Sequence, residues 1–269
     1  MRYVYWLAAL SFAFVIIERL RPRDRSQGFV RPGLVTDMFY IVFNGHFLGV
    51  LLAFASEPVI RSLDGSLHAM GVKEWFYLGA ASGWPLWLQG LVAFVGIDFF
   101  QWNVHRLLHH VPWLWELHKV HHSPPQLDWW ASFRFHWGEI IVYKSLTYPV
   151  MALLGFDGEM LFVLAVINTA IGHFNHANLK IDTGPLKYVF NSPAMHIWHH
   201  VHPDAGPPNR NFGISLAVWD WIFRTAHMPD HPPSRLGFEE IETFPTTAPG
   251  QMLYPVPIER WIRERFAGE

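Results

Sequence analysis

Histidine residues cluster in the middle part of this sequence with the spacing of metal ligands. Thirteen of the 17 histidines lie between residues 105 and 202. In a helix, residues three or four positions apart share one face, with Cβ atoms about 5–6 Å apart, so two imidazoles can reach one ion. Four groups have this spacing. They supply ten candidate metal ligands and catalytic residues: His105, His109, His118, His121, His122, His173, His176, His196, His199 and His200.

The number of histidines indicates two metal ions rather than one. A structural zinc ion takes about four ligands and a catalytic zinc ion about three with a water, so ten nitrogens overfill a single site. Neighbouring histidines on a helix point about 100° apart, which lets an H-x-x-H-H run serve two ions. Imidazole binds iron, copper, nickel and zinc, so ligand type alone leaves the metal open. His110, His136 and His202 are close enough in the sequence to replace one of the ten.

The composition excludes several classes of site and favours a membrane location. The chain has no cysteine, which excludes disulfides, iron–sulfur clusters, thiolate-ligated haem and cysteine-type zinc sites. A net charge of −2 gives no argument for nucleic acid as a partner. Charged residues make up only 16 % of the chain, and 14 tryptophans are present. Low charge and abundant Trp are typical of proteins in contact with lipid.

Five apolar runs predict the helices that position the histidines. A membrane helix needs about 20 apolar residues, so the first run is short, and a cleaved signal peptide is its alternative interpretation. The basic stretch at residues 19–25 follows that run and favours the cytoplasmic side. Three spans and a hairpin would then place every histidine group on the cytoplasmic face. The runs are residues 3–17, 38–60, 84–102, 140–156 and 160–172.

These patterns predict an all-α fold. We expect an integral-membrane, multi-pass helical bundle of about four spans, or two hairpins, with a cytoplasmic helical cap that holds a histidine-rich di-metal site. The predicted division has N-terminal membrane helices at residues 1–83, a catalytic domain at 84–225 and a C-terminal tail at 226–269. Residues 257–269 alternate charged and apolar side chains and are expected to form an interfacial helix or a solvated end.

The histidine boxes resemble those of the fatty acid hydroxylase/sterol desaturase superfamily, whose members are membrane histidine-box di-iron oxygenases. The residues between about 96 and 225, nearly half of the chain, carry this resemblance. Arg224 stands where many members have glycine. The matching elements are H-x-x-x-H at His105 and His109, H-x-x-H-H at His118, His121 and His122, a second H-x-x-H-H at His196, His199 and His200, and a run similar to the extra ligand pair of the family at His173 and His176.

The resemblance implies two iron ions per chain and O2 as co-substrate, with no bound haem, flavin or iron–sulfur cluster. It implies oxidation of a C–H bond of a lipid from the bilayer, by hydroxylation or by desaturation, and hydroxylation is favoured. Electrons would come from an external ferredoxin or cytochrome with its reductase, and Arg106 and Lys119 could contact an acidic donor. The alternatives are a non-redox zinc-dependent membrane hydrolase, a metal-handling membrane protein, and a transporter with histidine proton relays.

Carboxylates commonly fix the tautomers of ligating imidazoles. The candidates for this role are Asp98, Glu116, Asp128 and Asp220, and the alternative for each is a helix cap or a surface acid. His136 is a candidate for the lipid entrance, although a purely structural role is the more common fate of a lone histidine.

Overall fold

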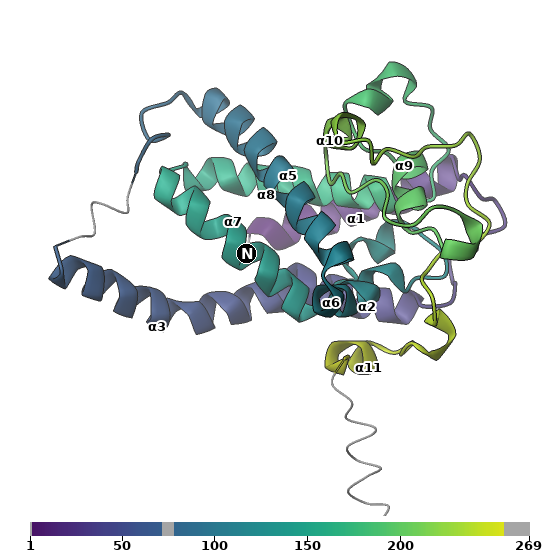
Figure 1. Ribbon diagram of the computed structural model, residues 1–269, viewed down its shortest axis with the longest axis horizontal. Helices are drawn as coiled ribbons and strands as arrows, with labels where there is room; N and C mark the ends of the chain where they lie inside the picture. Colours follow the sequence, from purple (N-terminus) through teal and green to yellow (C-terminus); the bar gives the residue numbers. More distant parts are fainter. Residues whose placement is uncertain (1, 72–77, 256–269) are drawn as a thin grey trace, which may run out of the picture.

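The structure is a computed structural model that describes residues 2–71 and 78–255. Long helices extend from a compact part made of short helices and loops (Figure 1). Within the described ranges there are isolated β-bridges but no strand. The long helical runs are α1 (Arg2–Leu20), α2 (Leu34–Val42) continued by the π-helical turn η1 (Phe43–Phe47) and by α3 (Leu48–Ala69), α5 (Leu86–His110), α7 (Trp137–Leu154) and α8 (Gly158–His176).

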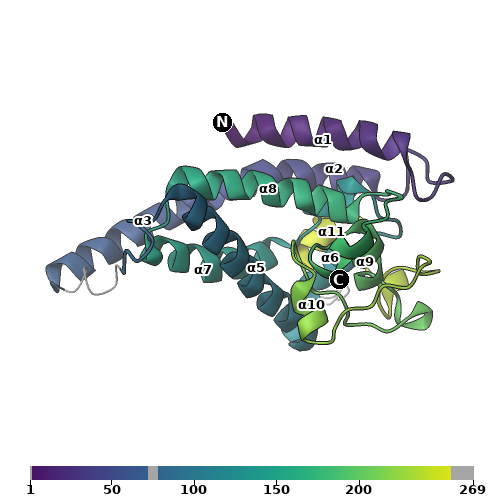
Figure 2. The same cartoon turned by 90° about the horizontal axis from the view of Figure 1, so that it is seen from above.

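The N-terminal helices pack on α8 and on the short segment η2 (Trp129–Phe133) that follows the second histidine box (Figure 2). Gly45 makes the contact of η1 with α1 possible, because a Cβ at this position would lie only 2.8 Å from Leu7 Cδ2. The C-terminal end of α1 is joined to the compact part by Glu18. This buried carboxylate accepts hydrogen bonds from the backbone N–H groups of Trp129 and Asn178.

α5 carries its apolar run without a break into the first histidine pair. It ends at His110 because Val111 takes an extended conformation. Pro112 then opens α6 (Pro112–His122) at the position where a missing N–H costs nothing. Leu108 and Leu114 pack together across this corner, so the histidines of α6 face those of α5.

α7 and α8 form the hairpin predicted from the two last apolar runs. Asp157 caps α8 by accepting a hydrogen bond from Met160 N at 2.9 Å. Ala93 and Ile97 of α5 pack against Met151 of α7 and Leu164 of α8. This packing sets the end of α8, with its histidines, beside the second histidine box.

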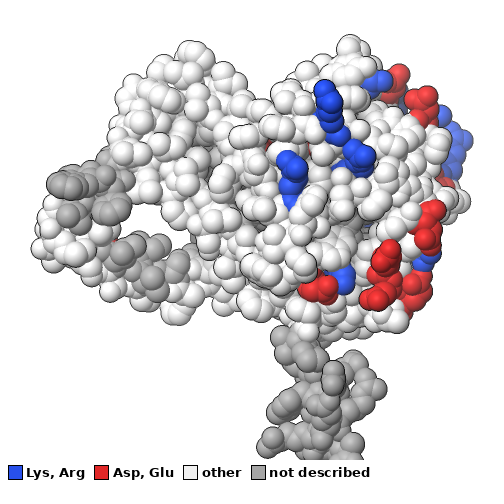
Figure 3. All heavy atoms as spheres, viewed as in Figure 1, with Lys and Arg blue, Asp and Glu red and all other residues white. Residues whose placement is uncertain are grey.

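Much of the outer surface of the long helices is apolar. Phe54 on α3 is 78 % exposed and Trp87 on α5 is 70 % exposed. Two helical stretches, Arg2–Leu20 and Leu34–Ala55, are long and apolar enough to cross a membrane. On the face drawn in Figure 3, charged side chains gather over the compact part and are few on the described surface of the long helices. Such a division is typical of a protein that is partly embedded in lipid.

The residues after α8 form short helices and ordered loops. They include α9 (Pro193–His199), α10 (Val218–Ile222) and α11 (Ala248–Leu253). Ser192 caps α9 and Pro193 occupies its first turn. Arg224 has a φ of 60°, the left-handed conformation that glycine adopts most readily, which fits the glycine that stands here in many family members.

The prediction of a helical protein is confirmed. The apolar runs at 3–17 and 160–172 lie within α1 and α8, the run at 38–60 crosses α2, η1 and α3, and the runs at 84–102 and 140–156 lie mostly in α5 and α7. The number of membrane spans, the cytoplasmic orientation and the domain boundaries stay predictions. The expected helix or solvated end at residues 257–269 lies outside the described residues.

Candidate metal centre

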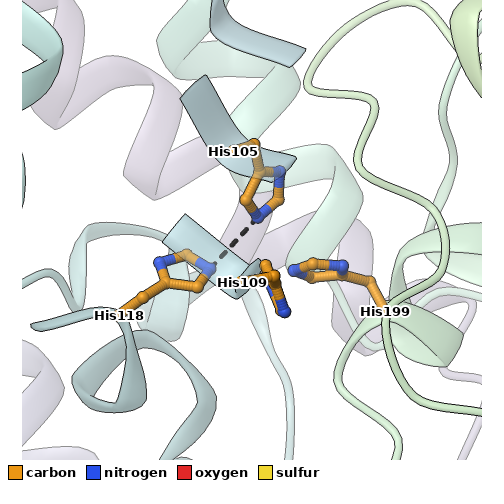
Figure 4. A group of neighbouring side chains, drawn as sticks. All are labelled: His105, His109, His118 and His199. Atoms are coloured by element: carbon orange, nitrogen blue, oxygen red, sulfur yellow. Dashed lines mark hydrogen bonds between the residues drawn. The ribbon is translucent and has the colours of Figure 1, made fainter. Parts of the chain in front are cut away.

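Eight histidines converge in two groups of four. The first group consists of His105, His109, His118 and His199, and the second of His121, His176, His196 and His200. Within each group the candidate ligand atoms all lie within 4.8 Å of one another. Figure 4 shows the first group, in which the imidazoles point toward a common centre from three elements.

Each group draws on three helices, and both share α6 and α9. The first group takes two side chains from the end of α5, one from α6 and one from α9. The second takes His121 from α6, His176 from the end of α8, and His196 and His200 from α9 and its C-cap. His118 and His121 are one helical turn apart but belong to different groups, so α6 separates the two groups.

Hydrogen bonds at Nδ1 fix the tautomers of the ligand candidates. A carbonyl oxygen only accepts, so an imidazole bonded to one carries its proton on Nδ1. His105 donates in this way to Phe212 O at 2.8 Å, and His199 to Arg210 O at 2.8 Å. His121 donates to Arg134 O at 3.2 Å and His176 to Gly172 O at 2.8 Å. In each of these neutral rings the Nε2 lone pair faces the centre of its group.

Within each group the Nε2 atoms lie so close together that their lone pairs repel each other unless a cation lies between them. His105 Nε2 and His118 Nε2 are 3.1 Å apart, and His121 Nε2 and His176 Nε2 are 3.4 Å apart. His121 and His176 both carry their proton on Nδ1, where each donates to a carbonyl oxygen, so this pair forms no N–H···N bond. His109 Nε2 is buried without a hydrogen-bond partner. This all-nitrogen donor set fits a transition-metal ion in each group.

Glu139, which the sequence analysis did not single out, holds His118. Its Oε1 accepts from His118 Nδ1 at 2.9 Å, and both side chains are buried. Glu139 lies at the start of α7, 21 residues after His118, so only the fold reveals the pair. Asn209 has a similar role, because its Oδ1 accepts from His109 Nδ1 at 3.1 Å.

Burial keeps the histidines of α6 and α9 neutral. Loss of solvent, followed by repulsion from neighbouring imidazoles, holds the pKa values of His118, His121 and His196 well below the usual 6.5. The same is true of His199, where the hydrogen bond to Arg210 opposes the effect of burial. Neutral imidazole is the form that binds metal, so the environment prepares these rings as ligands.

Two of the ten predicted ligands lie outside the groups of four. His122 lies between them, with its Nε2 3.1 Å from His199 Nε2 and its ring centroid 4.5 Å from that of His200. His173 lies one turn deeper in the helical bundle. Its Nδ1 bonds to Ser132 Oγ at 2.6 Å and its Nε2 to Ser11 Oγ at 3.3 Å. Both ring nitrogens of His173 are therefore engaged by hydroxyl groups, and this geometry gives it no ligand role.

The three neighbouring histidines that could have replaced a ligand also lie elsewhere. His110 is exposed and bonds to the Arg106 carbonyl of its own helix. His202 caps the short turn at Asp204. His136 bonds to Met252 O at 3.1 Å, so it holds the C-terminal segment against α7, and the structure gives no support for its predicted place at a lipid entrance.

None of the four carboxylates predicted to fix imidazoles bonds to a histidine of the site. Asp98 accepts from the backbone of Ser215 and Leu216 and from Trp219 Nε1, and Asp220 accepts from Trp102 Nε1 and from Phe212 N. Both acids therefore shape the loop whose Phe212 carbonyl orients His105. Glu116 pairs with Lys119, and Asp128 pairs with Arg31.

A pocket of about 280 Å³ opens beside the first group. His109, His122 and His199 form its inner wall, and Trp115, Lys119 and Asn209 are among its other lining residues. Glu239 and Glu240 also line it and are exposed. Lys119, a candidate contact for an acidic electron donor, bonds to Glu116 Oε1 at 2.7 Å.

Comparison with known proteins agrees with this geometry. The fatty acid hydroxylase family model matches residues 90–225, which is about half of the chain. The chain therefore belongs to the fatty acid hydroxylase family. The match contains both groups of histidines, together with Glu139 and Asn209.

The individual relatives are oxidative enzymes of lipids by name. The chain is 32 % identical to ornithine lipid hydroxylase OlsE of Rhizobium tropici over 151 residues, 56 % of this chain and 45 % of the relative. It is 30 % identical to alkylglycerol monooxygenase of Danio rerio over 54 % of this chain and 31 % of the relative. A third relative is Delta(7)-sterol 5(6)-desaturase erg3B of Aspergillus fumigatus, 28 % identical over 66 % of this chain and 52 % of the relative.

The matched region thus spans about half or less of the length of these curated relatives. No solved structure matches the chain.

Proposed function

We propose that this protein is a membrane-bound di-iron oxygenase that uses O2 and external electrons to hydroxylate a C–H bond of a lipid. The observation that carries the proposal is the pair of four-histidine groups with inward-facing Nε2 atoms. Membership of the fatty acid hydroxylase family supports the choice of reaction. The names of OlsE and alkylglycerol monooxygenase favour hydroxylation, while the sterol relative keeps desaturation as the related outcome.

Each of the two groups would hold one iron ion with its four histidines. His122 would complete the set from its position between the groups. Iron bound there supplies the redox chemistry that activates O2, which zinc does not. This proposal revises the predicted set of ten ligands to nine, because the nitrogens of His173 are taken by Ser132 and Ser11.

The residues of the chain around the ions orient and insulate the site. Glu139, Asn209 and four backbone carbonyls accept hydrogen bonds at Nδ1 of the ligands. Phe212 is fully buried and its ring packs edge-on against His105 and His109. Such apolar packing excludes water from one side of the first group, which protects reactive oxygen chemistry from side reactions.

The membrane arrangement is part of the proposal. The two apolar stretches Arg2–Leu20 and Leu34–Ala55, together with α5, α7 and α8, would embed the bundle, and the basic flank after α1 would place the histidine groups on the cytoplasmic face. The lipid would then enter from the bilayer, and a ferredoxin or cytochrome with its reductase would approach from the aqueous side.

Elemental mass spectrometry of purified protein from iron-supplemented cells tests this proposal. We expect about two irons per chain in the wild type and a loss of iron in His121→Ala and His199→Ala, one from each group. Zinc that supports lipid turnover without O2 or reductant would favour the zinc hydrolase instead. Fewer than two metals in the wild type would contradict the two-ion site.

A further inference from the structure

Four charged side chains are buried together next to the second histidine group. They are Arg31, Asp37, Asp128 and Arg134, and each residue is at most 5 % exposed. Arg31 and Asp37 precede the region that matches the family model, which begins at residue 90. Two positive and two negative charges make the cluster neutral, which is the condition under which buried ions are tolerated.

Asp37 joins the two arginines. Its Oδ2 accepts from Arg31 Nη2 at 2.7 Å, and its Oδ1 accepts from Arg134 Nε at 2.5 Å. Arg31 makes a two-pronged contact with Asp128 on its other side. Asp37 lies in the first turn of α2, where a negative charge is favoured by the helix dipole. One carboxylate of α2 therefore holds both arginines.

Arg134 in turn holds the acceptor that orients His121. Its backbone carbonyl receives the Nδ1–H of His121 at 3.2 Å. Its side chain bonds to Gly33 O at 2.9 Å and to Ser123 Oγ at 3.2 Å, at the C-cap of α6. The next residue, Phe135, stacks on the His121 ring with centroids 4.5 Å apart and planes 5° apart. A change in the position of Arg134 therefore moves both the carbonyl oxygen that accepts from His121 and the Phe135 ring that stacks on it.

The contacts from Asp37 through Arg134 lead to His121 of the second group and to none of the fixed partners of the first group. The fixed partners of the first group are Phe212 O, Glu139, Asn209 and Arg210 O. None of these groups bonds to the charged cluster in the described part of the chain.

We propose that Asp37 is a positioning residue for the second metal ion: by holding Arg134 it sets His121, so a residue outside the family's matched region controls the affinity of one ion of the pair. The inference rests on the proposed function in that the histidine groups bind metal. Loss of a partner that orients a ligand lowers metal affinity about 10- to 100-fold. We expect a loss of this size at the second group of Asp37→Asn and unchanged affinity at the first.

The test is metal occupancy of the full-length protein in detergent, equilibrated against a series of chelators of graded strength. Wild type should bind two irons, and Asp37→Asn should hold one of them about 10- to 100-fold more weakly. Two double variants assign the weakened ion. Asp37→Asn with His196→Ala should retain one ion at wild-type affinity, whereas Asp37→Asn with His109→Ala should retain only the weakened ion.

Glu139→Gln is the matched control, because it removes a buried carboxylate that orients a histidine of the other group. It should weaken the first ion and leave the second unchanged. If Asp37→Asn does not accumulate as folded protein, Arg134→Lys serves in its place, since lysine keeps the charge but cannot contact Asp37, Gly33 O and Ser123 Oγ together.

Equal loss at both groups, or wild-type affinity at both, in Asp37→Asn or in Arg134→Lys would overturn the inference. A wild type that binds fewer than two ions would overturn the proposed function itself, and this result is read before any variant is compared. The two failures are therefore distinguishable.

Discussion

Replacing Glu139 with glutamine tests how far a single carboxylate determines the first metal position. Glu139 Oε1 and His118 Nδ1 are 2.9 Å apart, and both side chains are at most 1 % exposed. His118 is a neutral ring, because burial and its neighbours hold its pKa well below 6.5. His118 therefore offers no positive charge to Glu139, whereas a cation bound at the far nitrogen of the same ring would hold this carboxyl in its charged form.

The magnitude follows from this geometry. Glutamine keeps an oxygen that can accept from Nδ1, so His118 keeps its tautomer, but the buried negative charge is lost. Changes of this kind weaken metal binding about 10- to 100-fold, or about 1.4–2.7 kcal/mol at 25 °C. Glu139→Ala should cost more, because it also leaves Nδ1–H unpaired in a buried place.

Chelator competition followed by elemental mass spectrometry gives the affinity of each ion. Glu116→Gln is the control, since Glu116 lies on the same helix as His118 but bonds to Lys119 and Tyr254. We expect this variant to bind both ions as the wild type does. If Glu139→Gln also bound both ions with wild-type affinity, the idea that this carboxylate orients and charges the first group would be wrong.

Three further predictions concern metal, stability and membrane contact. His173→Asn should retain two irons per chain, but its free energy of unfolding should fall by about 1–3 kcal/mol because buried hydrogen bonds are lost. His176→Ala, by contrast, should lose an iron. Equal loss of iron in both variants would return His173 to the ligand set. Removal of iron by a strong chelator should lower the melting temperature of the wild type, since an ion present at about 100 times its Kd adds about 2.7 kcal/mol to the free energy of unfolding. An unchanged melting curve would argue against bound metal. Val42→Asp, at an exposed apolar position near the middle of the stretch Leu34–Ala55, should reduce the fraction of protein recovered in carbonate-washed membranes because a charge in mid-span is costly. Full recovery would contradict the proposed span.

The helices of this protein were predictable because each depends on local sequence. The apolar runs are long, and breaks such as Asp157 before α8 and Pro112 before α6 are marked by residues that cap or start a helix. The histidine boxes were equally visible. The spacing of residues along single helices was therefore enough to predict the helical fold class and most of the candidate ligands.

The division of the histidines between two ions was not predictable in the same way. His118 and His121 lie one turn apart, and the i, i+3 spacing suggested a shared ion. They belong to different groups because His118 meets His105 of α5, whereas His121 meets His176 of α8. His173 and His176 have the same spacing, but His173 meets two serine hydroxyls from distant segments. Which histidine bonds to what depends on how the helices pack.

The carboxylate that orients an imidazole was also missed for a reason of packing. Glu139 and His118 are 21 residues apart and come together only where α7 crosses α6. The four acids chosen from the sequence are near the boxes along the chain, but Asp98 and Asp220 bond to backbone and Trp groups that shape a loop. Proximity in sequence was therefore a poor guide to the partners of the ligands.

Isotope labelling of the product tests the central claim most directly. Iron-loaded protein in nanodiscs made from the lipids of its host would be given a chemical reductant under 18O2, and the lipids would be read by mass spectrometry. The account predicts a lipid heavier by one 18O atom, formed only with iron, O2 and reductant and not formed by His121→Ala. A product that takes its oxygen from water, or that forms equally well without O2, would contradict it.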